Sequence, residues 1–296
     1  MSQKTAHDFD QDLLILFDAY VHGGIDRRTF LDRASKYAVG GVTAVMLLEQ
    51  LSPKFLAAQQ VKPEDARIEQ QYIEYPSPNG YGTMRGYLTR PAGAAAKAPG
   101  VLVIHENRGL NPHIEDITRR LAVDGFVAFA PDALFPLGGY PGDEDKAREL
   151  FPKLEQGKTR QDFIAAAAFL KSRPECTGKI GAVGFCYGGG MVNYLATQLG
   201  TDLSAGVAYY GSSPDAADVP KIKAPLLIQS AENDARINAS WPAFEEALKA
   251  AGARYERHLY PGTQHGFNND TTPRYDAAAA KLSWDRTLAF FRQHVR

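Results

Sequence analysis

The sequence predicts an α/β fold in which helices cover both faces of a mostly parallel sheet. Short, continuous apolar runs such as APGVLVIHE (98–106) and KIGAVGF (179–185) alternate along the chain with segments of helical spacing. Unbroken apolar runs are typical of strands buried on both faces, and right-handed crossovers then wind strands and helices into one open sheet. At 296 residues, the chain is expected to build one large core with an appendage.

The elements are expected in a simple order. An antiparallel hairpin over 72–91 opens the sheet, because two strand-like runs flank a Pro78-Asn79-Gly80 turn. Further strands are expected at residues 98–106, 126–132, 179–185, 205–211, 224–234 and 253–262. Helices are expected at residues 113–125, 146–173, from 188 onward, 242–251 and 275–294.

Composition and charge exclude several classes of function. The net charge is −1 and its acidic and basic residues are interspersed, so we expect neither a nucleic-acid partner nor a polybasic membrane contact. The two cysteines, Cys176 and Cys186, cannot form a disulfide scaffold and do not match a zinc-ligand spacing. No metal and no organic cofactor is implied.

Residues 1–60 permit two interpretations. Arg27-Arg28, followed by an apolar run over 37–48, is similar to a twin-arginine signal; the protein would then be periplasmic or exported, and otherwise cytoplasmic. Alternatively, helical spacing over 9–20, a Gly23-Gly24 break and a cap at Asp26 predict a helical hairpin, a candidate surface for homo-oligomer assembly. The apolar run is too short and too broken to span a bilayer. The catalytic domain is expected over 61–296.

Cys186 lies at a strand-to-helix junction. Gly184-Phe185-Cys186-Tyr187-Gly188 matches the nucleophile-elbow pattern with cysteine in place of serine, and its glycines relieve crowding in a strained turn. The thiol would lie at a helix N-terminus, which favours the thiolate. The competing interpretation is a small, buried, apolar cysteine.

A base and an acid follow Cys186 in the order that this architecture requires. Asp234 ends the strand LLIQSAEND, and His265 lies in a glycine-flanked loop between the last strand and the last helix. Glu232 is the competing carboxylate, and His105 is the next candidate among the seven histidines. We predict a Cys186–His265–Asp234 triad.

Further site residues follow from position. The backbone N–H groups of Tyr187 and Asn107 are expected to form the oxyanion hole. Glu106, at the end of VLVIHE, is expected near the thiol, where it could accept the thiol proton or raise the thiol pKa; its alternative role is a salt bridge to Arg108 or Arg119. Candidate pocket residues are Arg108, Phe135, Tyr140, Tyr187, Tyr210 and Trp241.

These motifs together resemble the dienelactone hydrolases, cysteine members of the α/β-hydrolase fold. The resemblance covers about residues 68–296 and rests on VLVIHENRGLNPHIED, FVAFAPD, GFCYGGG, AYYG, ENDARI and HGFNN. It implies that Cys186 is the nucleophile, that Asp234 and His265 complete the triad, and that Glu106 holds the resting cysteine.

The sequence departs from the family at the arginines that founding members use to grip a substrate carboxylate. Asn269 stands where one of them is expected, and the loop ALFPLGG, from Ala133 to Gly139, lacks the other. This argues against a small carboxylated lactone as the substrate. The expected function is hydrolysis of a small-molecule carboxylic ester or lactone through a thioester acyl-enzyme. The alternatives are a redox-responsive thiol, or a binding or assembly protein on the same fold.

Overall fold

The computed structural model describes residues 4–94 and 96–296 and contains one eight-stranded sheet in the order β1-β2-β4-β3-β5-β6-β7-β8. The strands β1 and β2 form the predicted antiparallel hairpin, and β2 also runs antiparallel to β4. From β4 to β8 all neighbouring strands are parallel. The predicted fold class is therefore confirmed.

The strands are β1 (Ile68–Ser77), β2 (Gly82–Pro91), β3 (Ala98–Ile104), β4 (Val127–Pro131), β5 (Cys176–Phe185), β6 (Ala205–Tyr209), β7 (Leu226–Asn233) and β8 (Tyr255–Gln264). The α-helices are α1 (Gln11–Val21), α2 (Arg27–Ala34), α3 (Ala44–Leu51), α4 (Phe55–Ala58), α5 (Pro112–Val123), α6 (Glu144–Leu150), α7 (Gln156–Ser172), α8 (Tyr187–Gln198), α9 (Ala235–Asn238), α10 (Trp241–Ala250) and α11 (Ala277–His294).

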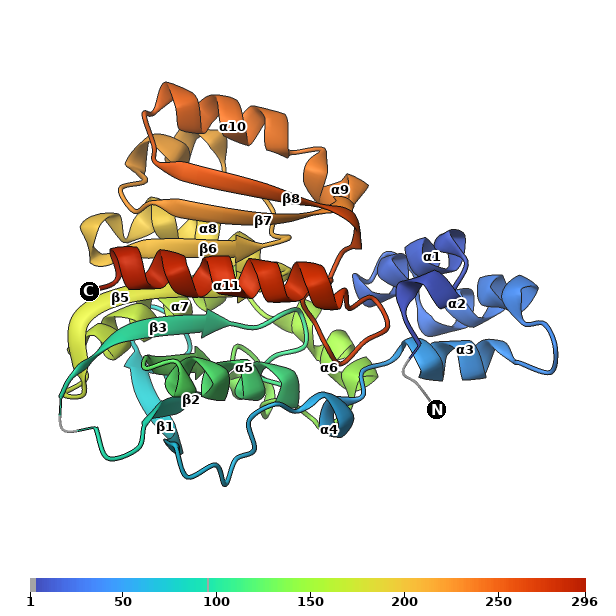
Figure 1. Cartoon of the computed structure of the whole chain (residues 1–296), viewed down its shortest axis with the longest axis horizontal. Helices are drawn as coiled ribbons and strands as arrows, with labels where there is room; N and C mark the ends of the chain where they lie inside the picture. The colour runs from blue at the N-terminus through green and yellow to red at the C-terminus, as the bar shows by residue number, and fades with distance from the viewer. Residues whose placement is uncertain (1–3, 95) are drawn as a thin grey trace.

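Helices bury both faces of the sheet, as its apolar strands require. In Figure 1, α5 and α11 lie in front of the sheet, and α7 and α8 lie behind it. The front core includes Ile117 of α5 and Phe291 of α11. The back core includes Phe163 of α7 and Val192 of α8. This packing fixes the strand ends from which the site residues project.

The segment predicted to be helical over 146–173 contains a break. The structure ends α6 at Leu150 and begins α7 at Gln156, with a short 3₁₀ turn over Phe151–Lys153 between them. Pro152 explains the break, because a proline inside a helix has no N–H to donate and its ring clashes with the preceding turn. The break places Phe151 beside Tyr187, with ring centroids 4.8 Å apart.

The N-terminal residues form more than a hairpin. Helices α1 to α3 pack around a core of their own that includes Phe17, Phe30 and Leu51, and we call residues 6–51 the N-terminal module. Asp26 caps α2 as predicted, since its side chain accepts a hydrogen bond from the N–H of Thr29. Arg27 and Arg28 form the first turn of α2. No helix in the described part of the chain is both long and apolar enough to cross a membrane.

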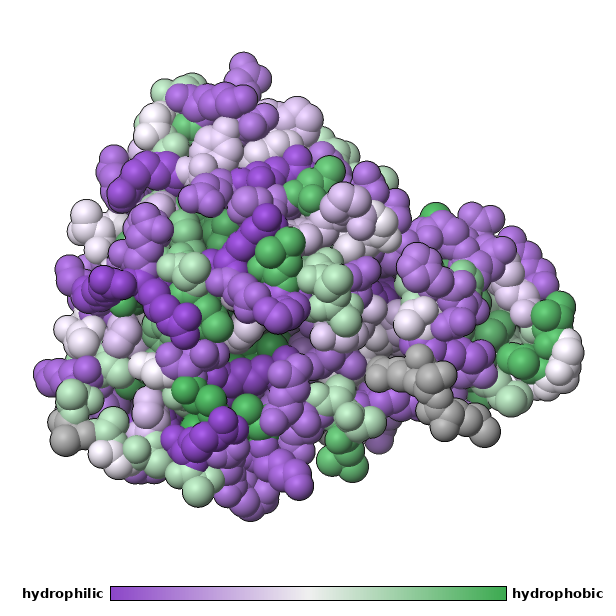
Figure 2. Space-filling model, viewed as in Figure 1, coloured by the Kyte–Doolittle hydropathy of each residue, from purple (hydrophilic) through white to green (hydrophobic). Residues whose placement is uncertain are grey.

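The module lies beyond the arrowhead of β3, at the right of Figure 1, and forms a separate lobe in Figure 2. The lobe is mostly hydrophilic, with apolar side chains at its far tip (Figure 2). Exposed apolar side chains around the turn into α3 include Val39, which is 72% exposed, and Val45. Assembly through these helices stays a prediction.

Polar contacts hold the module on the catalytic unit. The phenol of Tyr20 donates a hydrogen bond to Asp145, and Gln11 and Gln264 exchange side-chain hydrogen bonds of 2.8 and 3.1 Å. Arg274 lies 3.2 Å from Asp18. The module therefore has a defined position at the carboxyl ends of the strands, where the predicted site lies.

Candidate active site

Cys186 occupies the predicted turn between β5 and α8. Its backbone φ is 56°, in the left-handed region that non-glycine residues rarely adopt, and its N–H donates to the carbonyl of Tyr209 at 3.0 Å. A Cβ atom on Gly184 would lie 2.1 Å from the carbonyl oxygen of Gly188, and one on Gly188 would lie 2.1 Å from that of Ile104. The glycines are thus required by close backbone contacts around the turn.

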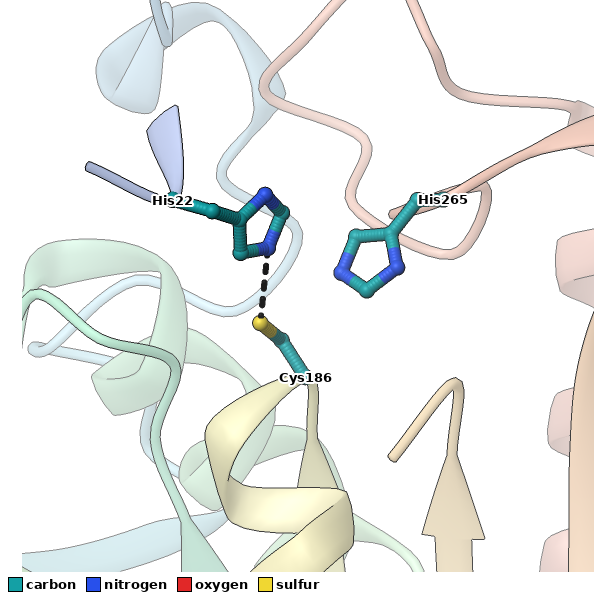
Figure 3. A group of neighbouring side chains, drawn as sticks. All are labelled: His22, Cys186 and His265. Carbon is teal, nitrogen blue, oxygen red and sulfur yellow. Dashed lines mark hydrogen bonds between the residues drawn. The ribbon is translucent and has the colours of Figure 1, made fainter. Parts of the chain in front are cut away.

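His265 and Asp234 meet beside this turn. Asp234 follows β7, His265 follows β8, and the Nδ1–H of His265 donates to the carboxylate of Asp234 at 2.5 Å. Both side chains are buried. This bond directs the Nε2 atom of His265 toward Cys186, as Figure 3 shows. Glu232, the competing carboxylate, instead accepts a hydrogen bond from the N–H of Gly262.

A second histidine, His22, reaches the thiol from the N-terminal module. His22 directly follows α1 as its C-cap residue, and its Nε2 atom lies 3.3 Å from the Sγ atom of Cys186 (Figure 3). Its Nδ1 atom lies 2.8 Å from the carbonyl oxygen of Asp18 and 3.2 Å from the carboxylate of the same residue. The sulfur is therefore flanked by two imidazoles, each with an aspartate behind it.

Sequence reasoning missed His22. Its local signal is a polar side chain directly ahead of the Gly23-Gly24 break, a pattern that predicts only the end of a helix. Nothing in the spacing connects residue 22 with residue 186, because their contact depends on how the module docks on the strand ends.

The two imidazoles control the charge of the thiol. Burial alone would raise the pKa of the Cys186 thiol, but the charges of His22 and His265 and the hydrogen bond with His22 lower it to about 6. Burial alone would lower the pKa of His22, but the thiolate and the hydrogen bond with Asp18 raise it to about 10. Burial alone would also lower the pKa of His265, but the charge of Cys186 and the hydrogen bond with Asp234 raise it. Near neutral pH the site therefore favours a thiolate beside an imidazolium.

Glu106 lies in the same cavity as Cys186 but has a different hydrogen-bond partner. Its carboxylate accepts a hydrogen bond of 3.1 Å from the side-chain amide of Asn269. The thiol instead forms a hydrogen bond with His22, and within residues 4–94 and 96–296 Glu106 forms no salt bridge with Arg108 or Arg119. A direct contact between the Glu106 carboxylate and the thiol thus stays a prediction.

Asn107 and Arg108 connect the site with the module. The Asn107 amide and the Arg108 guanidinium both donate to the carbonyl of Val21, at 3.1 and 2.9 Å. That carbonyl belongs to the last turn of α1, where the carbonyl groups receive no hydrogen bond from N–H groups of the same helix. These two bonds fix the position of the end of α1 and therefore of His22.

Tyr187 is the first residue of α8, so its N–H has no intrahelical acceptor and is available to a ligand.

Two cavities adjoin the sulfur. One, of about 50 Å³, is lined by residues that include Phe17, Glu106 and Arg274. The other, of about 310 Å³, is lined by Arg148, Phe151, Tyr187, Tyr210 and Arg236 among others. His22, Asn107 and Cys186 line both.

The predicted pocket residues divide accordingly. Arg108 lines the smaller cavity, and Tyr187 and Tyr210 line the larger one. Phe135, Tyr140 and Trp241 line neither: Phe135 lies under Arg85, Tyr140 donates to Glu144, and Trp241 packs against Phe244. Of the segment over 133–145, Glu144 and Asp145 line the smaller cavity, whereas Phe135 and Tyr140 lie outside both cavities, as does Trp241 at the start of α10.

Comparisons with known proteins agree with this architecture. The chain matches the family described as "Dienelactone hydrolase family" over residues 84–295, and residues 1–39 match a family described as "YqhI-like". It is 30% identical over 254 residues to an Escherichia coli (strain K12) protein named "Putative carboxymethylenebutenolidase", covering 81% of this chain and 92% of the relative. It is also 54% identical over 109 residues to the "Putative hydrolase fragment YghX" of the same organism, covering 37% of this chain and 93% of that fragment.

A solved structure shows the same fold. The crystal structure of a "Putative Dienelactone Hydrolase" from Klebsiella pneumoniae subsp. pneumoniae MGH 78578 is 30% identical, with a TM-score of 0.67. The similarity covers 76% of this chain and 100% of that one. With a family match that spans most of the chain and a fold and strand-end site that agree with it, the chain belongs to the dienelactone hydrolase family.

Proposed function

We propose that the protein hydrolyses a carboxylic ester or lactone through a thioester on Cys186. The observation that carries this proposal is the line of groups at the strand ends: a sulfur in a strained turn, the Nε2 atom of His265 facing it, and Asp234 on the other ring nitrogen at 2.5 Å. Nucleophile, base and orienting acid in this arrangement are the parts that acyl transfer requires.

The reaction follows from these positions. The thiolate attacks the substrate carbonyl, and the developing oxyanion accepts hydrogen bonds from the N–H groups of Tyr187 and Asn107. The carbon–oxygen bond to the leaving group breaks, and His265 gives that alkoxide a proton, leaving a thioester on Cys186. Water then loses a proton to His265, attacks the thioester and releases the acid and the thiolate.

The shape and charge of the site favour a small ester or lactone. The larger cavity offers aromatic walls at Phe151, Tyr187 and Tyr210 and has Arg148 and Arg236 at its edge. Asn269, bonded to Glu106, supplies no cation at the position where founding family members place an arginine. The relative named as a carboxymethylenebutenolidase makes lactones the first class to screen.

Hydrolysis of a short acyl nitrophenyl ester, followed by a panel of lactones and esters, tests the proposal in buffer that contains a chelator. We expect turnover by the wild type and at least a hundredfold loss in Cys186→Ala and in His265→Ala, because each removes a group that the chemistry uses directly. His7→Gln, an exposed change in the N-terminal module, is the matched control and should hydrolyse at the wild-type rate. Wild-type rates in both site variants would disprove the mechanism.

A redox-responsive thiol is the second candidate, and the lowered pKa of Cys186 favours it, because thiolates oxidise more readily than thiols. The other cysteine, Cys176, lies at the opposite end of β5, too far away for an intramolecular disulfide. Hydrolysis that depends on both Cys186 and His265 would separate the two candidates, since oxidation of a thiol requires no such base.

A further inference from the structure

The side chains around the sulfur form a cluster of metal-binding type. His22, Cys186 and His265 each offer one ligand atom, and these three atoms lie within 4.8 Å of one another. They come from the end of α1, the β5–α8 turn and the loop after β8, and they converge in Figure 3 on one small volume. Only the docked N-terminal module completes the set.

The donor atoms are those that zinc prefers. Zinc binds thiolate sulfur at about 2.3 Å and imidazole nitrogen at about 2.0–2.1 Å, so ligand atoms around a tetrahedral ion lie roughly 3.3–3.6 Å apart. The Nε2 atom of His22 is already 3.3 Å from the Sγ atom of Cys186. All three ligand atoms lie within 4.8 Å of one another. A displacement of the His265 ring by no more than roughly 1 Å would therefore bring its nitrogen into the range that zinc requires.

The hydrogen-bond partners of the two histidines are also those typical of a zinc site. Ligating histidines usually donate their second ring N–H to a carboxylate or a backbone carbonyl, which orients the free nitrogen toward the metal. His22 has Asp18 in this position, at 2.8 Å from its carbonyl and 3.2 Å from its carboxylate, and His265 has Asp234 at 2.5 Å.

One of the ligand atoms has no other partner. The Nε2 atom of His265 is buried, the residue is only 5% exposed, and within residues 4–94 and 96–296 this nitrogen has no hydrogen-bond partner. It points into the space between the sulfur and His22 (Figure 3). An unpaired buried nitrogen directed at a sulfur and a second imidazole is the arrangement that a cation would satisfy.

We propose that His22, Cys186 and His265 bind a zinc ion, with the fourth position open to water, and that zinc reversibly inhibits the enzyme. Binding occupies the lone pairs of the sulfur and of the His265 nitrogen, which hydrolysis needs. The inhibition rests on the proposed function, whereas the binding itself does not. Since His22 belongs to the N-terminal module, the module would give the enzyme its sensitivity to zinc.

The positive charge of Arg236 lowers the affinity of this site for zinc. Its guanidinium lies 3.3 Å from the Nε2 atom of His22, where its charge opposes a cation, but its side chain is exposed and free to turn toward solvent. Replacing it with glutamine should therefore tighten zinc binding.

Metal binding is measured on the full chain after treatment with a chelator. Cobalt titration reports a sulfur-to-cobalt charge-transfer band, and zinc is then titrated in competition with a chromogenic zinc indicator. We expect one ion per chain. Zinc affinity should fall at least about tenfold in His22→Gln and about 10- to 100-fold in Asp18→Asn, the usual cost of a lost outer partner. It should rise in Arg236→Gln and stay unchanged in His7→Gln.

Ester hydrolysis supplies the second readout. Zinc should inhibit the wild type, a chelator should restore it, and His22→Gln should need more zinc for the same inhibition. Equal zinc affinity in the wild type and His22→Gln, or no sulfur-to-cobalt band, would overturn the inference while leaving the hydrolase proposal intact. A metal-free protein that is inactive until zinc is added would overturn both the inhibitory role and the thioester mechanism.

Discussion

At the scale of single residues, the main feature is a thiol held between two imidazoles. His265 and its partner Asp234 follow the order of a catalytic triad, but His22 comes from outside the hydrolase fold. The Asp18–His22 pair repeats the Asp234–His265 pair on the other side of the sulfur. The charge state of Cys186 therefore depends on a residue that the triad does not require.

This predicts a shift in thiol reactivity in His22→Gln. Glutamine keeps a hydrogen-bond donor but cannot carry the positive charge that stabilises the thiolate. In buffer with a chelator, the rate of Cys186 alkylation by iodoacetamide should rise with pH through about 6 in the wild type. In the variant the midpoint should move upward, toward the usual thiol value of about 8.5.

The direction follows from which form is stabilised: a lowered thiol pKa means that the thiolate is present above about pH 6 and is lost below it. His7→Gln should keep the wild-type profile, because His7 is exposed. Superimposable profiles for the wild type and His22→Gln would show that His22 does not influence the thiolate.

At the scale of elements, the β5–α8 junction decides where the sulfur lies. The turn works only because Gly184 and Gly188 let the start of α8 lie directly against the neighbouring backbone. The positive φ of Cys186 is one cost of this geometry, and the buried contacts of β5 in both cores and of α8 in the back core maintain it.

We expect Gly184→Ala to destabilise the protein by about 1–3 kcal/mol or more, as overpacking does. The added Cβ would lie 2.1 Å from the Gly188 carbonyl oxygen, and neither backbone can move without displacing α8. Denaturant and thermal unfolding measure the effect.

Gly157→Ala is the matched control, because no atom lies within 4 Å of its added Cβ and α7 is helical there. It should leave stability unchanged or raise it by up to about 1 kcal/mol. Equal stability of the two variants would mean that the elbow tolerates a side chain.

At the scale of the whole molecule, the N-terminal module forms one wall of the candidate active site. It has its own core, yet its α1 end is held by Asn107 and Arg108 and its Tyr20 by Asp145. It lines both cavities at the sulfur through His22. Access to Cys186 therefore depends on how firmly the module is docked.

Tyr20→Phe tests this dependence. The change removes a half-buried hydrogen bond to Asp145, worth about 0.5–1.5 kcal/mol, and should raise the undocked population roughly 2- to 10-fold. Labelling of Cys186 by a bulky maleimide should speed up accordingly, and hydrogen exchange around residues 21–23 should increase.

Tyr255→Phe provides the control, since it removes a phenol–carboxylate hydrogen bond, to Glu245, on the remote β8–α10 side of the molecule. Its labelling rate should match the wild type. If Tyr20→Phe also matches the wild type, Tyr20 contributes nothing to docking.

The sequence by itself determined the strands, the sheet type and the Cys186, Asp234 and His265 positions, because hydrophobic periodicity and the glycine-flanked turn are local properties. It could not show that Phe135, Tyr140 and Trp241 lie outside both cavities at the sulfur, nor where α6 and α7 are separated. Only the tertiary structure brought His22 to the thiol. That contact joins residues 164 positions apart through the docking of one packed unit on another, and no local pattern encodes such a distance.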